Sequence, residues 1–474
     1  MCIRDRLLSD LIANVEGSLD SNQVDPEIKR VIHDSREVSE GDIFCCLRGE
    51  TTDGHNYIQE AIDSGASALF AEEVSEFDIP TFLVGDVRSE LPRIASRIVG
   101  NPSKELTVVG VTGTNGKTSV VNLLSEILRK TGISTATIGT LTGKLTTPES
   151  PELQRELRRH CSSGVGVVGM EVSSHSLIQK RVEETCFSTV AFTNLSHDHL
   201  DFHGKMENYY NAKGLLFSRV FSERAVISTD EEYGQSYFEK AVSSGMEVKA
   251  LSLKERDVLF DQNSSSFNWR GKRVTIPLGG PFAFSNALVS AEIAIQLGLE
   301  TADIIAGLKS ANPIEGRFEP LVITEGISAI IDYAHTPSAL GELLEGCRKI
   351  ATGRIILVFG CGGDRDSEKR PLMGEVASRG ADVNILTSDN PRSEDAEKII
   401  SEIISGMSIN PQSVYVDRRQ AIEEAVDEAK SGDLIVIAGR GHEKYQEIKG
   451  EKVPFSDKSV LLEKVAQLSS SGER

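Results

Sequence analysis

The sequence predicts an α/β protein of three domains: an N-terminal α/β domain, a central domain with a mainly parallel sheet, and a C-terminal Rossmann-like domain. Short apolar runs alternate with amphipathic stretches along the chain, as strands and helices do in layers on parallel sheets. The 474 residues are 39% hydrophobic, enough for roughly two to four domains. Two breaks in the apolar periodicity favour three domains.

The first break is "IVGNPSKEL", 98–106, where Asn-Pro-Ser precedes the strand-like "LTVVGVTG". The second is "NPIEGRFEP", 312–320, which separates a helical stretch from the strand-like "ISAIIDYAH". We therefore expect domains over residues 1–103, 104–317 and 318–474.

The C-terminal region shows a doubly wound pattern. Strands at "RIILVFG", "DVNILTSD", "VYVD" and "DLIVIAG" alternate with helices over about 369–379, 394–406 and 418–430. The first turn, "GCGGDRD", has Arg365 where a dinucleotide fingerprint needs its last glycine. This domain is therefore not expected to bind a dinucleotide.

Composition limits the partners of the chain. The formal charge is −20, with 51 basic against 71 acidic residues, so no electrostatic footprint for nucleic acid or an anionic membrane exists. Seven cysteines without a C-x-x-C pair suggest a reducing compartment. The first residues lack a secretory apolar core, and no apolar run is long enough to span a bilayer. We expect a cytoplasmic monomer that acts on small molecules, without nucleic acid and without membrane insertion.

A phosphate-binding loop is predicted at "VVGVTGTNGKTSVVNLL", 108–124, although its spacing is unusual. The common loop, G-x-x-x-x-G-K-[ST], needs a glycine at position 111, which is valine here. An apolar strand precedes the turn and an apolar-periodic helix follows it, as phosphate binding requires. Backbone N–H groups would then hold phosphates, Lys117 would neutralise them and Thr118 would bind Mg²⁺. The alternative is an ordinary glycine turn with a surface lysine.

Acidic and imidazole groups follow two later strands. Glu171 ends the apolar run "VGVVGM", and "FTNLSHDHLDFHG" holds three histidines and two aspartates within seven residues. His197, His199 and His203 could form a zinc site, but no cysteine joins them, and the neighbouring phosphate loop favours Mg²⁺. Capping or solvation in a loop is an equally good explanation for any one of these histidines alone.

With these residues the chain resembles the Mur ligase family of peptidoglycan synthesis, and is similar to its members that make UDP-N-acetylmuramoyl-tripeptide. The resemblance runs from about residue 30 to 460. It rests on "HDSREVSEGDIF", "GETTDGHNYI", "GTNGKT", "TTPE", "MEVSSH", "TNLSHDHLDFHG", "YYNAKGLLF", "GRFE", "DYAHTP", "VFGCGGDRDSEKRPLMG", "SDNPRSE" and "GRGHEKYQ". T-G-T-N-G-K-T is this family's own phosphate loop, which accounts for the missing glycine.

The resemblance implies a role for each matching position. For ATP these are Gly113, Thr114, Asn115, Gly116, Lys117, Thr118 and Ser119, with Asn286, Arg317, Asp332, Tyr333 and His335 around the base, ribose and phosphates. For the UDP-muramoyl-dipeptide they are Ser35 in "DSR", Thr146, Thr147, Ser173, Gln179 and Arg181. For two magnesium ions they are Thr118, Glu171, His199 and Lys213, the last as an N6-carboxylysine (carbamate). The catalytic residues would be Lys117, Lys213, His199 and Glu171.

Lys213 and Ala283 depart from what their surroundings or the family lead one to expect. Lys213 in "YYNAK" would by itself be read as a lysine on a helix surface, and only the resemblance makes it a magnesium ligand. The family commonly has Phe-Asn where this chain has "GPFAF", with Ala283. One polar contact near the nucleotide is thereby in doubt, whereas Asn286 remains.

The resemblance also implies the reaction. A D-glutamyl carboxylate attacks the γ-phosphate of ATP, and an amine then displaces phosphate from the acyl phosphate to form an amide. The incoming amino acid would be meso-diaminopimelate or, as the alternative, L-lysine, which lacks the distal carboxylate. The "DNPR" motif favours diaminopimelate because the fork of Arg392 suits a carboxylate. The pocket would comprise Arg365, Asp389, Asn390, Pro391, Arg392, Gly439 and Glu443. The plainer alternative for Arg392 is an ion pair with Glu394.

Two other functions are compatible with parts of this sequence. A phosphate-loop switch or non-catalytic nucleotide-binding module needs the loop but neither "DNPR" nor "GRGHE". A folylpolyglutamate synthetase shares the loop and the central domain, but that family lacks the N-terminal "DSR" domain.

Overall fold

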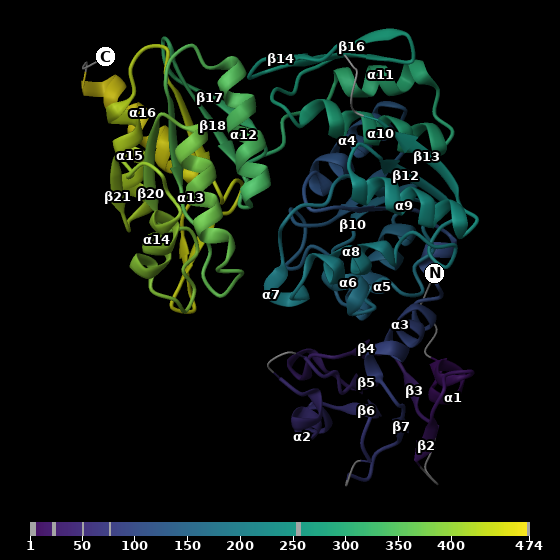
Figure 1. Cartoon of the computed structure of the whole chain (residues 1–474). Coiled ribbons are helices and arrows are strands. Elements are labelled where there is room, and N and C mark those ends of the chain that lie inside the picture. The colour runs from purple at the N-terminus through teal and green to yellow at the C-terminus, as the bar shows by residue number, and fades with distance from the viewer. Residues whose placement is uncertain (1–5, 21–24, 50–51, 75–76, 253–256, 472–474) are drawn as a thin grey trace.

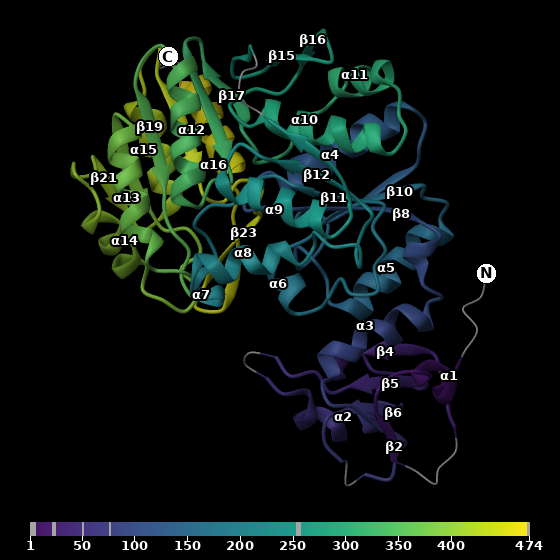
Figure 2. The ribbon, with the colours of Figure 1, turned by 45° about the vertical axis from the view of Figure 1, so that its right-hand side comes forward.

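The computed structural model describes residues 6–20, 25–49, 52–74, 77–252 and 257–471. Three sheets of five, six and six strands each take their strands from one of the three expected ranges. The C-terminal domain lies beside the central domain, and the N-terminal domain lies below it (Figures 1 and 2). The three-domain α/β fold is confirmed, while the domain limits themselves stay predictions.

The N-terminal domain is a five-stranded sheet in the order β2-β7-β6-β5-β4, parallel except at β2. Its elements are β1 (Arg6–Leu7), α1 (Leu8–Ile12), β2 (Ser18–Asp20), β3 (Glu27–Ile28), β4 (Arg30–Ile32), η1 (Ser35–Glu37), β5 (Asp42–Cys45), η2 (Gly54–Tyr57), α2 (Ile58–Asp63), β6 (Ala66–Ala71), β7 (Thr81–Leu83), α3 (Val87–Ile98) and η3 (Pro102–Lys104). Helix α3 buries Leu91 and Ile94 against this sheet and also packs on α5 of the central domain, so it joins the two domains.

The central sheet is fully parallel, in the order β13-β12-β11-β8-β10-β9. Its elements are β8 (Thr107–Thr112), α4 (Lys117–Lys130), β9 (Thr135–Ile138), α5 (Ser150–Ser162), β10 (Val167–Glu171), α6 (Ser174–Ile178), β11 (Thr189–Phe192), α7 (Leu200–His203), α8 (Met206–Gly214), β12 (Arg224–Ser228), α9 (Glu232–Ser243), β13 (Glu247–Leu251), β14 (Leu259–Phe260), β15 (Ser265–Trp269), β16 (Lys272–Ile276), α10 (Ala283–Gln296) and α11 (Thr301–Lys309). Because parallel strands buried on both faces need cover on both, two cores form, one under α4, α10 and the β14–β16 sheet and one under α5 and α9.

The C-terminal sheet has the order β17-β18-β22-β19-β20-β21 and is parallel except at β17. Its elements are β17 (Glu319–Thr324), β18 (Ile327–Asp332), α12 (Pro337–Ile350), β19 (Ile355–Phe359), α13 (Lys369–Gly380), β20 (Val383–Thr387), α14 (Ala396–Ser405), β21 (Ser413–Tyr415), α15 (Arg418–Glu428), β22 (Leu434–Ala438), β23 (Tyr445–Ile448), β24 (Glu451–Pro454) and α16 (Asp457–Ser471). All elements expected after residue 350 are present. Helix α14 starts two residues later than predicted because the Asp395 side chain caps it, accepting from Glu397 N.

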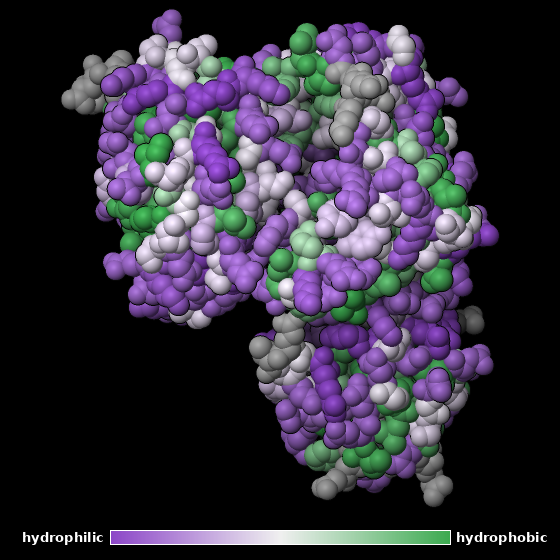
Figure 3. All heavy atoms as spheres, in the orientation of Figure 1, coloured by the Kyte–Doolittle hydropathy of each residue, from purple (hydrophilic) through white to green (hydrophobic). Residues whose placement is uncertain are grey.

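Polar residues cover most of the face seen in Figure 3, with small hydrophobic areas scattered among them. None of the helices built from the described residues combines the length and apolar composition needed to cross a membrane. The carboxyl ends of the central strands β8, β10 and β11 meet at one edge, where ligands bind in open α/β sheets. The candidate site lies there.

Candidate active site

The phosphate-binding loop connects β8 to α4 and depends on two glycines. Gly113 and Gly116 have φ of 153° and 84°. A Cβ at Gly113 would lie 1.8 Å from Thr193 Oγ1, and one at Gly116 would lie 2.5 Å from Asn286 Oδ1. Val111 is a fully buried strand residue, so position 111 is not part of the turn and needs no glycine.

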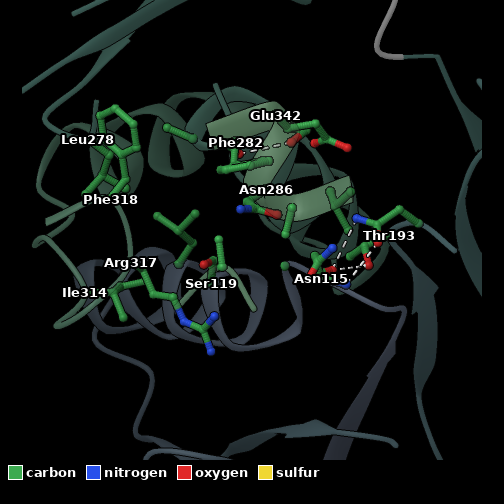
Figure 4. A pocket seen from close by; sticks show the side chains of 18 of the residues that line it. Asn115, Ser119, Thr193, Leu278, Phe282, Asn286, Ile314, Arg317, Phe318 and Glu342 are labelled. Carbon is green, nitrogen blue, oxygen red and sulfur yellow. Dashed lines mark hydrogen bonds between the residues drawn. The ribbon is translucent and has the colours of Figure 1, made fainter. Parts of the chain in front are cut away.

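Residues after β11 hold this loop. Thr114 N donates to Asn194 O at 2.8 Å and Asn115 N to Asn194 Oδ1 at 2.9 Å. Thr193 Oγ1 donates to Asn115 O at 2.6 Å, a contact visible in Figure 4. The sequence prediction missed Thr193 and Asn194, although "TN" at a strand end, before the histidine cluster, was an available signal.

Lys117 is the first residue of α4, and its ammonium group lies within the loop. Its Nζ donates to Gly113 O at 2.8 Å and to Thr114 O at 2.9 Å. Burial lowers the pKa of Lys117, while Glu171 and Asp198 act in the opposite sense. A phosphate entering the loop would compete for the same N–H donors.

Thr118 and Glu171 form a buried oxygen pair. Thr118 Oγ1 donates to Glu171 Oε2 at 2.9 Å, and the other carboxylate oxygen accepts from Thr140 N at 2.9 Å. Adjacent ligands of an octahedral Mg²⁺ with bonds of about 2.1 Å lie about 3 Å apart. A hydroxyl and a carboxylate oxygen at this separation therefore fit that ion.

His199 lies beside a buried carboxylate. Its Nε2 is 3.3 Å from Asp198 Oδ2, and burial lowers the pKa of His199 to about 3. Burial alone would raise the pKa of Asp198, but His199, His335 and Lys369 together hold it below its ordinary value. A neutral imidazole can serve as a metal ligand. Asp198 and Lys369, 3.9 Å apart, were not predicted as site residues.

The three histidines considered for zinc have different partners. His197 Nε2 lies 2.9 Å from Asp366 Oδ2, and His203 Nε2 lies 2.9 Å from Ser174 Oγ. Within the part of the chain that the structure describes, no three His, Cys, Asp or Glu side chains gather as a metal site. This arrangement gives the zinc alternative no support.

Lys213 is a buried residue, so its interpretation as a helix-surface lysine is wrong. It lies on α8 with 1% exposure, its Nζ donates to Gly113 O at 2.9 Å, and it is 4.6 Å from the centre of the Tyr209 ring. Burial and the neighbouring Lys117 lower the pKa of Lys213 well below its ordinary value. Lys117 and Lys213 thus both donate to the same backbone oxygen, that of Gly113.

A pocket next to the loop, the nucleotide pocket, lies between α10 and the segment that enters the C-terminal domain. Its lining includes Asn115, Gly116, Ser119, Asn286, Arg317, Asp332 and Tyr333 of the predicted ATP residues. Leu278 and Phe318 lie at one end, and Asn115 with Thr193 at the other (Figure 4). Ala283, the first residue of α10, also lines it, so that part of the wall is apolar.

Arg317 and Asp332 are fixed at the domain junction. The Arg317 guanidinium lies 4.4 Å from the centre of the Tyr333 ring, and its Nη2 donates to Thr118 Oγ1 at 3.4 Å. Asp332 accepts from Phe318 N and Ala334 N at 2.6 and 2.8 Å. His335 is not among the residues that line the nucleotide pocket; its Nε2 lies 3.9 Å from Asp198 Oδ2.

A second pocket, the interdomain pocket, is lined by residues of all three domains. The predicted residues that line it are Thr146, Thr147, Ser173, Gln179, Arg181, His199, His335, Arg365, Asp389, Asn390, Arg392, Gly439 and Glu443. Ser35 and Pro391 are not among its lining residues. Ser35 is buried in the N-terminal domain. The candidate positions for a UDP-linked dipeptide and for an amino acid therefore face one space.

The C-terminal wall of this pocket is an ordered polar network. Asn390 Nδ2 donates to Glu443 Oε2 at 2.8 Å, and Asn390 Oδ1 accepts from Arg440 Nη1 at 2.7 Å. Burial and Asp389 raise the pKa of Glu443.

Arg392 does not pair with Glu394, so that alternative is wrong. Glu394 lies 2.8 Å from Arg370 instead. The Arg392 Nε lies 3.5 Å from Glu447 Oε2, and its Nη1 donates to Gly363 O. Arg392 is consequently held at the pocket wall.

A phosphate loop lies beside one pocket, and a second pocket is shared between three domains, an arrangement that suits an enzyme acting on a nucleotide and on substrates held by separate domains. The chain belongs to the Mur ligase family. Three family models match it: "Mur ligase family, catalytic domain" over residues 27–109, "Mur ligase middle domain" over 111–294, and "Mur ligase, glutamate ligase domain" over 316–441.

Two relatives are UDP-N-acetylmuramoyl-L-alanyl-D-glutamate--2,6-diaminopimelate ligases. The protein of Clostridioides difficile is 40% identical over 96% of this chain and 98% of its own length. That of Aquifex aeolicus is 41% identical over 92% of this chain and 93% of its own.

Solved structures agree. A structure of a ligase of that same name has a TM-score of 0.68 and 29% identity, and covers 98% of this chain and 100% of its own. FolC of E. coli in complex with ADP shares the fold alone. It is 20% identical, has a TM-score of 0.60, and covers 81% of this chain and 94% of its own.

Proposed function

We propose that this chain is an ATP-dependent amide ligase that adds meso-2,6-diaminopimelate to UDP-N-acetylmuramoyl-L-alanyl-D-glutamate, in cytoplasmic synthesis of peptidoglycan precursors. One observation carries the proposal. Residues matched to the muramoyl-dipeptide, such as Arg181, and residues matched to diaminopimelate, such as Arg392 and Glu443, line the same pocket. We expect a monomer.

The positive charges around the phosphate loop support a reaction through an acyl phosphate. The D-glutamyl carboxylate would attack the γ-phosphorus of ATP as the bond to the leaving ADP oxygen breaks. The amine would then attack the acyl carbon, lose a proton and release phosphate. Such phosphoryl transfer needs positioning and charge neutralisation more than covalent help. Lys117 supplies a partly buried positive charge at the loop, and Arg317 supplies another beside Thr118.

Mg²⁺ belongs to the proposal through the oxygen pair of Thr118 and Glu171, with His199 and the carbamate of Lys213 for a second ion. When bound, Mg²⁺ would neutralise phosphate charge and orient the transferred group. The loop residues would meanwhile hold the phosphates, and the domain contacts between Asp198 and Lys369 would help to keep water away from the acyl phosphate.

Diaminopimelate fits the pocket better than L-lysine does. Arg392 offers a planar fork for the distal carboxylate, and Glu443, with Asn390 beside it, offers an acceptor for the distal ammonium. With lysine, the Arg392 donors facing the pocket would lack this partner, a cost of roughly 1–3 kcal/mol.

The test is phosphate release from ATP with UDP-N-acetylmuramoyl-L-alanyl-D-glutamate and either meso-diaminopimelate or L-lysine. Release that depends on diaminopimelate supports the proposal. Equal release with lysine would replace our assignment of the amino acid with the alternative. Release with neither would overturn the ligase assignment.

A further inference from the structure

The N-terminal domain gives the interdomain pocket two of its lining residues, Gly49 and Arg88. Arg88 is the second residue of α3. Of the residues that line this pocket, it is the one charged group from that domain, and its side chain is 21% exposed. No role for Arg88 follows from the motifs described above.

The Arg88 side chain crosses to the central domain. Its Nη1 donates to Glu149 Oε2 and to Gln179 O, both at 3.3 Å, and its Nη2 donates to Arg48 O at 3.4 Å. Arg181 meets the same carboxylate, with its Nε 2.9 Å from Glu149 Oε1. Two guanidinium groups thus share one carboxylate, which leaves the cluster with a net positive charge.

The position of Arg88 is fixed by the start of α3. The Asp86 side chain caps this helix by accepting from Ser89 N, and Lys180 Nζ donates to Ser89 Oγ. One turn further along, Arg93 Nε lies 3.8 Å from Glu184 Oε1. The helix therefore lies on segment 179–184, where two of the predicted substrate residues, Gln179 and Arg181, are found.

We propose that Arg88 binds the diphosphate of the UDP-linked substrate, together with Arg181. This inference rests on the proposed function. In that substrate the diphosphate lies between the uridine, assigned to the N-terminal domain, and the dipeptide, whose carboxylate must reach ATP in the central domain. The diphosphate must therefore cross the boundary between these domains, where the two guanidinium groups lie. Guanidinium matches phosphate with paired N–H donors, and each group has five.

The experiment measures the Kd of UDP-N-acetylmuramoyl-L-alanyl-D-glutamate, and of UDP and uridine as its competitors, for wild type, Arg88→Gln, Arg88→Lys and Arg93→Gln. Arg88→Gln should weaken binding of the UDP-linked substrate about 10- to 100-fold and remove most of the advantage of UDP over uridine. Its KM for ATP should stay unchanged. Arg88→Lys should keep part of the affinity because a point charge remains.

Arg93→Gln is the matched control. It removes an ion pair between the same helix and the central domain but nothing from the pocket lining, so substrate binding should not change. An equal loss of UDP and uridine binding in Arg88→Gln would indicate a docking role and overturn the inference, as would an unchanged Kd. If Arg88→Gln does not fold, the Arg88→Lys variant decides. A loss of affinity for UDP but not for uridine in this variant supports the inference, and wild-type affinity for both overturns it. Wild type that binds no UDP-linked substrate would instead refute the proposed function.

Discussion

Lys213 illustrates how a single residue acquires its chemistry from its surroundings. The residue is 1% exposed, its amine lies next to the loop carbonyl of Gly113 and the cation Lys117, and its pKa is far below that of a free lysine. Only a neutral amine can add carbon dioxide, so this environment favours the carbamate that the proposed magnesium site requires.

Replacement of Lys213 by methionine should therefore abolish most of the turnover and leave diaminopimelate binding little changed. Labelled bicarbonate should give a carbamate signal in the nuclear magnetic resonance spectrum of wild type and none in the variant. Lys240→Met is the control, because Lys240 lies on α9 and also has a lowered pKa but does not contact the loop. A wild-type enzyme that is active without any carbamate signal would contradict this role.

Arg392 should determine the choice of amino acid. Arg392→Gln should lower kcat/KM for diaminopimelate about 10- to 100-fold, since one charge-assisted carboxylate contact contributes about 1.5–3 kcal/mol. Turnover with L-lysine should fall much less, so the preference of the enzyme for diaminopimelate over L-lysine should become smaller. Steady-state kinetics with both amino acids measures this.

Arg379→Gln, a change at an exposed ion pair on α13, should leave both rates unaltered. Equal losses for both amino acids in Arg392→Gln would mean that Arg392 supports the wall of the pocket rather than reading the carboxylate.

At the scale of elements, the pocket wall depends on how strand ends are held. Arg418, at the start of α15, and Asp457, at the start of α16, form a fully buried pair with Nε to Oδ1 at 2.7 Å. Arg418 Nη2 also donates to Ala438 O at 3.0 Å, at the end of β22. This contact fixes the backbone immediately before Gly439.

Arg418→Ala should destabilise the protein by about 3–5 kcal/mol, because an unpaired buried carboxylate remains. Urea unfolding followed by circular dichroism measures the change. Arg419 is its neighbour and pairs with Glu463 at the surface at 2.7 Å. Arg419→Ala should cost less than about 1 kcal/mol. Similar midpoints for the two variants would refute the structural role given to the buried pair.

Helices and strands were the features that sequence pattern predicted best. The expected elements after residue 350 are present because the strands are mainly apolar runs, and two of the helices, α14 and α15, begin at the capping residues Asp395 and Asp417. Helix ends were less accurate, since apolar periodicity does not report which side chain caps the first turn.

At the scale of the whole molecule, packing makes stability sensitive to acid. Burial lowers the pKa of His203 and of His442 to about 4 each. Between pH 6.5 and about 4 the unfolded chain therefore binds more protons at these sites than the folded protein does, and stability falls as the pH falls. Carboxyl groups with raised pKa, such as Glu443 and Glu342, contribute in the opposite sense.

The difference between wild type and the double variant His203→Gln/His442→Gln isolates the histidines. Between pH 7 and pH 5, the free energy of unfolding of wild type should fall more than that of the double variant. The extra fall should be on the order of 1 kcal/mol per histidine, after screening by water. Urea titrations at several pH values measure the two slopes. Parallel slopes would show that these imidazoles titrate normally in the folded protein.

The sequence by itself determined the α/β class, the phosphate loop, the family and the residues of each motif, because periodicity and motif spacing are local properties of the chain. Only the tertiary structure decided that Lys213 is buried, that Arg392 lies against Glu447 and not Glu394, that Asp198 meets Lys369, and that Arg88 reaches the pocket. Burial and partner choice depend on which segments pack together across domains, and residues far apart in the chain carry no local signal of that packing.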